Sequence, residues 1–399
     1  MSRGVLIMAG GTGGHIYPGL AVADSLRSSG VPVRWLGARG GMECDKVPPA
    51  GIEIDVVDIS ALRGKGLVTK LTMPFKLLRA VYQAFSLLGE HRPSCAVSFG
   101  GYAAGPGGLA AKLRGIPLMV HEQNRVPGMT NRTLARFASK VLQAFPGSWD
   151  EELQATTVGN PVRRTVVDLD EPASRYEGRQ GPLRILLTGG SQGALALNRL
   201  VPEALGLLAE EGIEFETRHQ AGPRWVEETR AAYKDVGIPC RSDVSREEKA
   251  ADQAGFAIPE HPPEKQVATH VAPTTKASAE VTDFIEDMAS AYAWADVVVC
   301  RAGALTVSEV AAAGVAALFI PFPHAVDDHQ TRNAEFLVEN DAALLLQESE
   351  TDARKLANVL SPLAGDRARL ASMAARGRAV AAPDSASRVA ELCRGYVTS

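Results

Sequence analysis

The chain has 399 residues, of which 45% are hydrophobic and 22% charged, and its 42 basic and 46 acidic residues give a net charge of −4. This length exceeds the usual size of a single hydrophobic core, so two domains are expected, and the slightly negative charge argues against a nucleic-acid partner. Five scattered cysteines without a CxxC spacing argue against a disulfide framework or a zinc site and favour free thiols in a reducing cytoplasm.

The first half of the chain predicts alternating strands and helices. Val5–Ala9 begins almost at the N-terminus, so no signal peptide is expected, and residues 18–28 are predicted as the next helix. Further short strands are predicted at residues 33–36, 54–57, 96–98 and 118–120. Alternation of this kind is typical of a parallel sheet that helices cover on both faces.

The pattern restarts at Leu183, with strands predicted at residues 185–188, 215–219, 297–300 and 317–320. We therefore predict an α/β protein of two similar domains, each with a parallel sheet, with the polar residues 168–181 as the linker. The predicted boundaries are 1–165 for the first domain, 166–370 for the second and 371–399 for a C-terminal helix that packs back on the first domain.

Two further segments limit this picture. Residues 241–280 contain four prolines and many charges, and we expect an inserted polar excursion rather than core. The most apolar stretch, residues 310–322, is shorter than the roughly 18 residues that span a bilayer. We expect a soluble protein or one attached to the membrane surface.

Glycine-rich loops follow the first strand of each half. They are Gly10–Gly14, with His15 next, and Gly189–Gly193. Backbone N–H groups and a helix N-terminus after such a loop form a phosphate site. The first loop has Ile16 where the dinucleotide fingerprint needs glycine, and no P-loop motif is present. The alternative is that the glycines serve only tight turns.

Polar side chains accompany these junctions. His15 can serve as a general base toward a hydroxyl, or it can simply hydrogen-bond nearby backbone at a helix start. A third strand-to-helix junction spans residues 303–309, where Thr306 and Ser308 offer hydroxyls to a phosphate and Glu309 can accept two ribose hydroxyls. The alternative is a plain helix cap, with Glu309 in the first turn.

Two acidic motifs suggest a metal only weakly. Asp327, Asp328, His329 and Gln330 lie near His324, but carboxylates and amides also hold sugar hydroxyls. Asp168 and Asp170 form a DxD pattern within the predicted linker, away from any glycine loop. We therefore predict no metal and no cofactor.

A basic amphipathic segment spans residues 59–89, which include no acidic residue. Its cations are Arg63, Lys65, Lys70, Lys76 and Arg79, and Pro74 suits the first turn of a helix. Two apolar stripes follow, one of Phe75, Leu78, Tyr82 and Phe85 and the other of Leu77, Val81, Ala84 and Leu88. One stripe can pack on the sheet, and the spare one suits an anionic membrane surface, or the helix is simply buried.

Six motifs in order resemble the MurG family, the bacterial N-acetylglucosaminyltransferases of peptidoglycan synthesis. They are GTGGH at 11–15, SFGGY at 98–102, HEQN at 121–124, GNPVR at 159–163, GGSQG at 189–193 and RAGALTVSE at 301–309. The match covers nearly the whole chain except residues 241–280, and Ala302 stands where the family often has serine. The resemblance implies a GT-B fold, in which two Rossmann-like domains face each other across a cleft.

The resemblance implies transfer of GlcNAc from UDP-GlcNAc to the 4-hydroxyl of the MurNAc sugar of lipid I, with inversion, to form lipid II. It implies His15 as the base, Ser191 and Arg163 at the diphosphate, the Ile285 backbone at uracil, Glu309 at the ribose, and Gln330 with Asp328 at the GlcNAc hydroxyls. Further substrate contacts are implied for Thr12, Gly13, Gly14, Asn124, Ala304, Leu305, Thr306, Val307 and Ser308.

The same resemblance implies a peripheral protein at the cytoplasmic face of the cell membrane. Its partners are then UDP-GlcNAc, the undecaprenyl-pyrophosphoryl-MurNAc-pentapeptide acceptor, an anionic membrane surface and cell-wall and division proteins, with no nucleic acid. The alternatives are a UDP-GlcNAc epimerase of GT-B fold, a Rossmann-type oxidoreductase, which the failed fingerprint disfavours, and a non-catalytic membrane adaptor.

Overall fold

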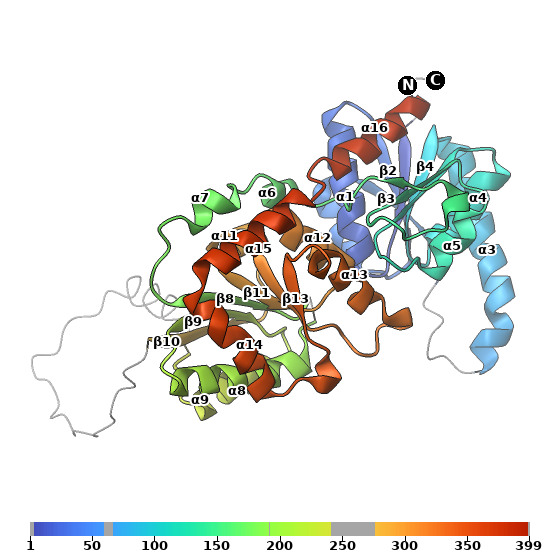
Figure 1. Ribbon diagram of the computed structural model, residues 1–399. Coiled ribbons are helices and arrows are strands. Elements are labelled where there is room, and N and C mark those ends of the chain that lie inside the picture. The colour runs from blue at the N-terminus through green and yellow to red at the C-terminus, as the bar shows by residue number, and fades with distance from the viewer. Residues whose placement is uncertain (1–3, 60–66, 191, 241–275, 398–399) are drawn as a thin grey trace, which may run out of the picture.

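The computed structural model describes residues 4–59, 67–190, 192–240 and 276–397. They form two parallel sheets, each with helices on both faces, as the sequence predicts (Figure 1). The first sheet has the order β3-β2-β1-β4-β5-β6-β7, and the second has the order β10-β9-β8-β11-β12-β13. In both sheets the strand order reverses beside the first strand in sequence, which is where ligands bind in open α/β sheets.

The first sheet consists of β1 (Val5–Ala9), β2 (Val33–Ala38), β3 (Glu53–Val57), β4 (Cys95–Gly100), β5 (Leu118–Glu122), β6 (Lys140–Gln143) and β7 (Thr156–Thr157). Its helices are α1 (Gly13–Ser28), α2 (Glu43–Lys46), α3 (Leu67–His91), α4 (Ala104–Leu113) and α5 (Met129–Ala135). Every residue of β1 is buried, with Ile7 in the core on one face and Met8 in the core on the other. Burial on both faces explains why this strand reads as a continuous apolar run.

The second sheet consists of β8 (Leu183–Thr188), β9 (Phe215–Gln220), β10 (Ala277–Thr282), β11 (Val297–Cys300), β12 (Ala316–Phe319) and β13 (Ala343–Leu345). Its helices are α6 (Arg164–Val167), α7 (Pro172–Tyr176), α8 (Leu195–Glu210), α9 (Val226–Asp235), α11 (Met288–Trp294), α12 (Ala304–Ala313), α13 (His329–Val338), α14 (Ala353–Gly365) and α15 (Arg367–Ala379). Leu186 and Leu187 again enter the cores on opposite faces.

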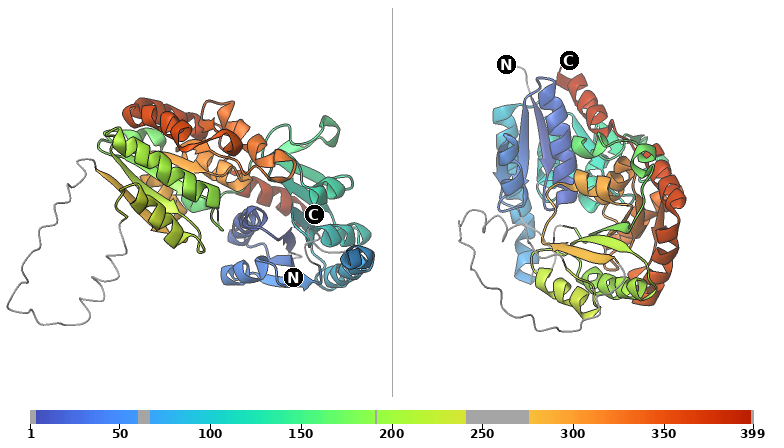
Figure 2. Two further views of the ribbon diagram at one scale, coloured as in Figure 1. Left: turned by 90° about the horizontal axis from the view of Figure 1, so that it is seen from below. Right: turned by 90° about the vertical axis from the view of Figure 1, so that its left-hand side faces the viewer.

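The last helix, α16 (Ser385–Val397), packs against α1 of the first domain, and the two helices lie side by side in Figure 1, with the blue N-terminal and red C-terminal segments also together in Figure 2. Val389, Ala390 and Cys393 enter the same core as Ile7. The Ser385 hydroxyl donates to the Asn160 carbonyl at 2.8 Å. The chain therefore crosses between the domains once before β8 and again before α16.

Three expectations from the sequence need correction. Helix α1 begins at Gly13 rather than at residue 18, with Thr12 at its N-cap position, so that Pro18 lies inside the helix rather than at its start. The predicted insertion at 241–280 ends within β10, which pairs with β9, because Ala277 and Ala279 are small buried residues that give a weak strand signal. Residues 241–275 lie outside the described residues.

The predicted linker at 168–181 is not a free connection. It contains α7, and Tyr176 is buried in the second core, where its hydroxyl donates to the Asp296 carbonyl at 2.7 Å. The arginine-rich composition reads as polar, yet Arg175 and Arg179 donate to backbone carbonyls of the second domain. The domain boundaries at 165 and 370 stay predictions.

Candidate functional site

The predicted site residues gather where the two domains meet, at the carboxyl ends of the strands. Helices α1 and α12 contact each other there, and Arg163 lies between them, with its guanidinium carbon 5.8 Å from the centre of the Tyr17 ring. The sequence elements that carry the first glycine loop and the third junction are thus neighbours in space.

The first glycine loop is held by a carboxylate that we did not predict. Glu43 is fully buried, and its Oε2 accepts from Gly11 N–H at 3.0 Å while its Oε1 accepts from Ala38 N–H at 2.8 Å. A Cβ at Gly10 would lie 2.2 Å from Oε1 and one at Gly41 would lie 2.5 Å from Oε2, so the glycines make room for this carboxylate. Glycine at these positions therefore makes space for the carboxylate that holds the loop, in addition to permitting the turn.

His15 lies in the first turn of α1, half-buried. Its Nδ1 lies 3.0 Å from the Gly10 carbonyl oxygen, which can only accept, so Nδ1 carries the proton. The Nε2 atom then holds the free lone pair and has no hydrogen-bond partner among the described residues. This tautomer is the one a general base needs. Nε2 faces Gly100, because a Cβ there would lie 3.3 Å from it.

The motif at 121–124 forms a buried hydrogen-bond network. The Glu122 carboxylate accepts from Asn124 N–H at 2.9 Å, Asn124 Nδ2 at 3.1 Å, Gly128 N–H at 3.1 Å and Asn131 Nδ2 at 3.0 Å. Burial lowers the pKa of His121 to about 4, so this imidazole is neutral and serves structure rather than charge. Asn124 is thereby fixed at the domain boundary, as a binding residue requires.

Arg163 and Glu309, predicted to contact different parts of the donor, contact each other. Arg163 Nε and Nη2 both donate to Glu309 Oε1, at 3.0 and 2.8 Å, and the Tyr292 hydroxyl donates to Oε2 at 3.3 Å. Burial raises the pKa of Glu309 against the opposing effect of Arg163. Burial alone would lower the pKa of Arg163, but the Glu309 charge outweighs it and the pKa is raised.

Helix α12 begins at Ala304, with Gly303 as its N-cap. The N–H groups of Ala304, Leu305 and Thr306 precede the first hydrogen bond within the helix, from Val307 to Gly303, and are therefore available to an anion. The Ser308 hydroxyl instead donates to the Ala304 carbonyl at 2.9 Å. Glu309 lies in the second turn rather than the first, so the expectation of a simple capping glutamate is wrong.

The other predicted donor contacts lie on loops and at a helix start of the second domain. The Ile285 N–H and C=O lie in the loop before α11 and have no partner among the described residues, which leaves them open to a planar base. Gln330 lies in the first turn of α13, and its Oε1 accepts from Phe322 N–H at 3.0 Å. Ser191 lies outside the described residues, but Gly190 and Gly193 form the predicted turn through a 2.8 Å hydrogen bond.

Neither acidic motif forms a metal cluster. The described part of the chain contains no group of three or more His, Cys, Asp or Glu side chains that could hold a metal ion. Asp328 caps α13 in a left-handed conformation, and its carboxylate accepts from the Thr331 hydroxyl at 2.7 Å. Asp168 pairs with Arg164 at 3.1 Å, one helical turn away.

Helix α3 presents one of its two apolar stripes to solvent. Val81, Ala84 and Leu88 are buried, whereas Phe75, Leu78 and Tyr82 are 76%, 67% and 71% exposed. The division of the two stripes is incomplete, because Leu77 of the buried stripe is exposed and Phe85 of the exposed stripe is half-buried. Lys76 is exposed beside them, but Arg79 forms a 2.9 Å ion pair with Asp58, which immediately precedes the acid-free segment. Arg63 and Lys65, and the side chain of Lys70, lie outside the described residues. In the described part of the chain no helix is long and apolar enough to cross a membrane.

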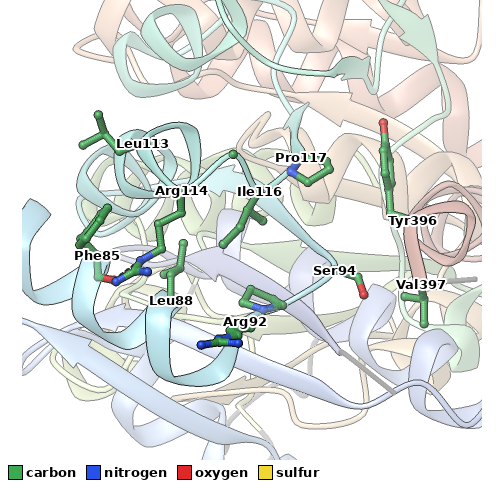
Figure 3. Close-up of a pocket in the computed structure, with 12 residues that line it drawn as sticks. Phe85, Leu88, Arg92, Ser94, Leu113, Arg114, Ile116, Pro117, Tyr396 and Val397 are labelled. Atoms are coloured by element: carbon green, nitrogen blue, oxygen red, sulfur yellow. Dashed lines mark hydrogen bonds between the residues drawn. The ribbon is translucent and has the colours of Figure 1, made fainter. Parts of the chain in front are cut away.

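A cavity of about 690 Å³ opens near this helix, at the amino ends of the strands of the first sheet, whereas the site lies at their carboxyl ends. Residues that precede β4 and β5, including Ser94 and Pro117, line it together with Arg92, Arg114 and Tyr396 (Figure 3). None of the predicted site residues lines this cavity, so it does not bear on their assignment.

Three residues of the site escaped the sequence reasoning: Glu43, Tyr292 and Asn333. Each is buried, and each holds a predicted site residue or loop through a long-range contact. Glu43 comes shortly after the glycine pair Gly40–Gly41, and an acidic residue near glycines is only a weak indication in a sequence of a buried anchoring carboxylate. Asn333 lies one turn after Gln330, and only its helical spacing could have suggested a shared face.

Two family models match the chain. They are the glycosyltransferase family 28 N-terminal domain, over residues 5–143, and the family 28 C-terminal domain, over residues 184–252 and 257–389. The gap between the two C-terminal segments falls inside the predicted insertion.

Relatives match over nearly the whole chain. The chain is 49% identical to the UDP-N-acetylglucosamine–N-acetylmuramyl-(pentapeptide) pyrophosphoryl-undecaprenol N-acetylglucosamine transferase of Xanthomonas campestris pv. campestris (strain 8004), over 98% of this chain and 81% of that protein. It is also 49% identical to the protein of the same name in Alcanivorax borkumensis, over 98% of each chain. The crystal structure of Acinetobacter baumannii MurG is similar with a TM-score of 0.79 and 39% identity, over 98% of this chain and 99% of that one.

Proposed function

This chain belongs to glycosyltransferase family 28 and within it to the MurG family, and from that membership we propose how its residues act. It has the GT-B fold and is an N-acetylglucosaminyltransferase that moves GlcNAc from UDP-GlcNAc to lipid I, giving lipid II for peptidoglycan synthesis. One observation carries this conclusion, namely the 49% identity to relatives of that name over 98% of the chain. The geometry at the domain boundary supplies residues suited to this chemistry.

The donor diphosphate, in this proposal, binds between two helix N-termini. The N–H groups of Ala304, Leu305 and Thr306 face it from α12, and those of Gly13 and Gly14 face it from α1. Oriented N–H groups and helix dipoles stabilise the negative charge that grows on UDP as the sugar–phosphate bond breaks. Thr12, Ser191, Val307 and Ser308 complete this surface, and no step requires a metal.

Donor binding exchanges partners at the Arg163–Glu309 pair. The ribose hydroxyls donate to the Glu309 carboxylate and take over from Arg163, whose guanidinium turns to the diphosphate. The pairing in the structure supports this role because it places the guanidinium and the carboxylate side by side at the domain boundary, with each charge balanced by the other. The Ile285 backbone then binds uracil, and Gln330, Asp328 and Asn124 bind the GlcNAc side of the donor.

His15 is the proposed base. Its free Nε2 accepts the proton of the acceptor 4-hydroxyl as that oxygen attacks the anomeric carbon opposite the departing UDP, which inverts the configuration. The hydrogen bond from Nδ1–H to the Gly10 carbonyl, 3.0 Å between N and O, supports the role because it orients the ring and stabilises the imidazolium that forms.

The exposed face of α3 is the proposed contact with an anionic membrane surface at the cytoplasmic side. Phe75, Leu78 and Tyr82 supply apolar contact, and Lys76 supplies charge next to them. This placement lets the polyprenyl tail of the acceptor stay in the membrane while its sugar reaches the site. Cell-wall and division proteins are further proposed partners.

The test is UDP release from UDP-GlcNAc with and without a soluble lipid I analogue. Release that depends on the analogue supports the transferase. Release without the analogue, or conversion of the free sugar nucleotide to its 2-epimer, would support the epimerase alternative, which the names of the relatives do not favour.

A further inference from the structure

A set of hydrogen bonds and an ion pair joins the two domains beside the site. Asn124 and Arg125 follow β5 of the first domain. Asn333 and Glu335 lie on α13 of the second domain, and Glu339 is the C-cap residue of that helix. We call these five residues the clasp. Helix α13 also carries Gln330 in its first turn, so the clasp ties a proposed donor-binding helix to the proposed donor-binding residue Asn124.

The buried half of the clasp is Asn333, whose side chain is fully buried. Its Nδ2 donates to Asn124 Oδ1 at 3.2 Å and to the Ala302 carbonyl at 3.2 Å, and its Oδ1 accepts from Arg125 N–H at 2.9 Å. One amide therefore links the exits of β5 and β11 with α13. The bonds to Asn124 and Arg125 form only when the domains are together, whereas the bond to the Ala302 carbonyl lies within the second domain. Separation of the domains would exchange the two bonds between them for bonds to water.

The outer half is an ion pair. Arg125 Nη1 and Nη2 donate to the two carboxylate oxygens of Glu339, each at 3.0 Å, and Glu335 lies 3.8 Å from Nη1. The Arg125 side chain is 24% exposed, so this two-pronged contact is partly shielded from water. Arginine forms such a fork with a carboxylate, whereas lysine provides a single point of charge.

We propose that the clasp holds the closed arrangement of the domains in which Asn124 and Gln330 face the donor together. Arg125, Asn333 and Glu339 are then positioning residues, which set the apparent affinity for the nucleotide sugar without touching it. This inference rests on the proposed function, because it assigns the donor to this boundary. If the closed state is less populated, the apparent affinity for the donor falls by the same factor as that population, while the chemical step after binding is unchanged.

The experiment compares Arg125→Met and Arg125→Lys with the wild-type chain. Exposed or partly exposed ion pairs contribute modestly, so we expect Arg125→Met to raise the KM for UDP-GlcNAc about three- to tenfold with kcat unchanged. Arg125→Lys keeps the charge but loses the fork, so its KM should fall between the two. The control is Arg199→Met, which removes a more exposed arginine–glutamate pair, with Glu228, that lies within the second domain and does not cross between the domains.

A second readout does not depend on the transferase. The Arg125 N–H exchanges with deuterium only when its bond to Asn333 opens, so Glu339→Met should speed that exchange by a similar factor, and bound UDP should slow it in the wild-type chain. A faster exchange together with a raised KM supports the clasp. An unchanged KM in Arg125→Met, a fall in kcat alone, or an unchanged exchange rate in Glu339→Met would overturn it. Absence of any analogue-dependent UDP release would instead count against the proposed function, and the exchange measurement would still decide on the clasp.

Discussion

Replacement of Glu43 by glutamine tests whether a buried carboxylate positions the first glycine loop. In the wild-type chain both carboxylate oxygens accept backbone N–H groups, from Gly11 and Ala38. Glutamine keeps the shape but turns one acceptor into an N–H donor, which then faces another N–H group. Loss of one hydrogen bond to a charged acceptor costs about 1.5–3 kcal/mol.

For a domain of this size a loss of about 2 kcal/mol corresponds to a melting temperature lower by about 4–8 °C. A displaced loop also moves His15, and small misplacements of catalytic groups reduce rates steeply, so we expect kcat to fall about ten- to a hundredfold. The donor KM should change less, because most proposed donor contacts come from the second domain.

Thermal unfolding and steady-state kinetics of Glu43→Gln measure both effects. The matched control is Glu53→Gln, which removes the same charge from an exposed position of the same domain, where Glu53 pairs with Arg34. The control should lie within about 0.5 kcal/mol of the wild-type chain. A Glu43→Gln variant with wild-type melting temperature and kcat would refute the idea that this carboxylate positions the loop.

Four further outcomes are expected. His15→Ala should reduce kcat about a hundredfold or more with little change in UDP-GlcNAc affinity measured by calorimetry, and near-normal turnover would exclude the base role. Glu309→Ala should mainly raise the donor KM, about tenfold, and an unchanged KM would remove the ribose contact. Leu78→Ser should weaken binding to anionic vesicles in a flotation assay more than Lys76→Gln does, because the apolar stripe supplies most of the area buried in the membrane. Equal binding by the wild-type chain and both variants would contradict the membrane contact. Burial lowers the pKa of His219 to about 3, so between pH 6.5 and about 3 the unfolded state binds a proton that the folded state does not. The free energy of unfolding should therefore fall as the pH drops below 6.5, and it should fall less steeply with pH in His219→Gln.

The sequence predicts the strands that are apolar throughout, and it misses several that mix polar and small residues. Val5–Ala9 and Val297–Cys300 have the predicted bounds, because burial on both faces demands continuous apolar runs. Lys140–Gln143 and Ala277–Thr282 mix polar and small residues, and their strand character comes from pairing with neighbours. No local pattern encodes such pairing.

The same division holds at the site. Motif residues such as His15 and Glu309 stand out because their chemistry follows glycine turns in sequence. The partners that hold them do not, since Glu43, Tyr292 and Asn333 act over separations of 32, 17 and 209 positions. The pairing of Arg163 with Glu309 is likewise a property of the fold, as 146 positions separate them.

UDP release in the presence of UDP-GlcNAc, measured with and without a lipid I analogue, is the most direct test of whether this chain forms lipid II. A lipid II-forming transferase releases UDP only when the analogue is present, and its product carries one added GlcNAc in the inverted, β configuration. Release that is absent, or that is equal with and without the analogue, would contradict the assignment of this chain as the transferase that forms lipid II.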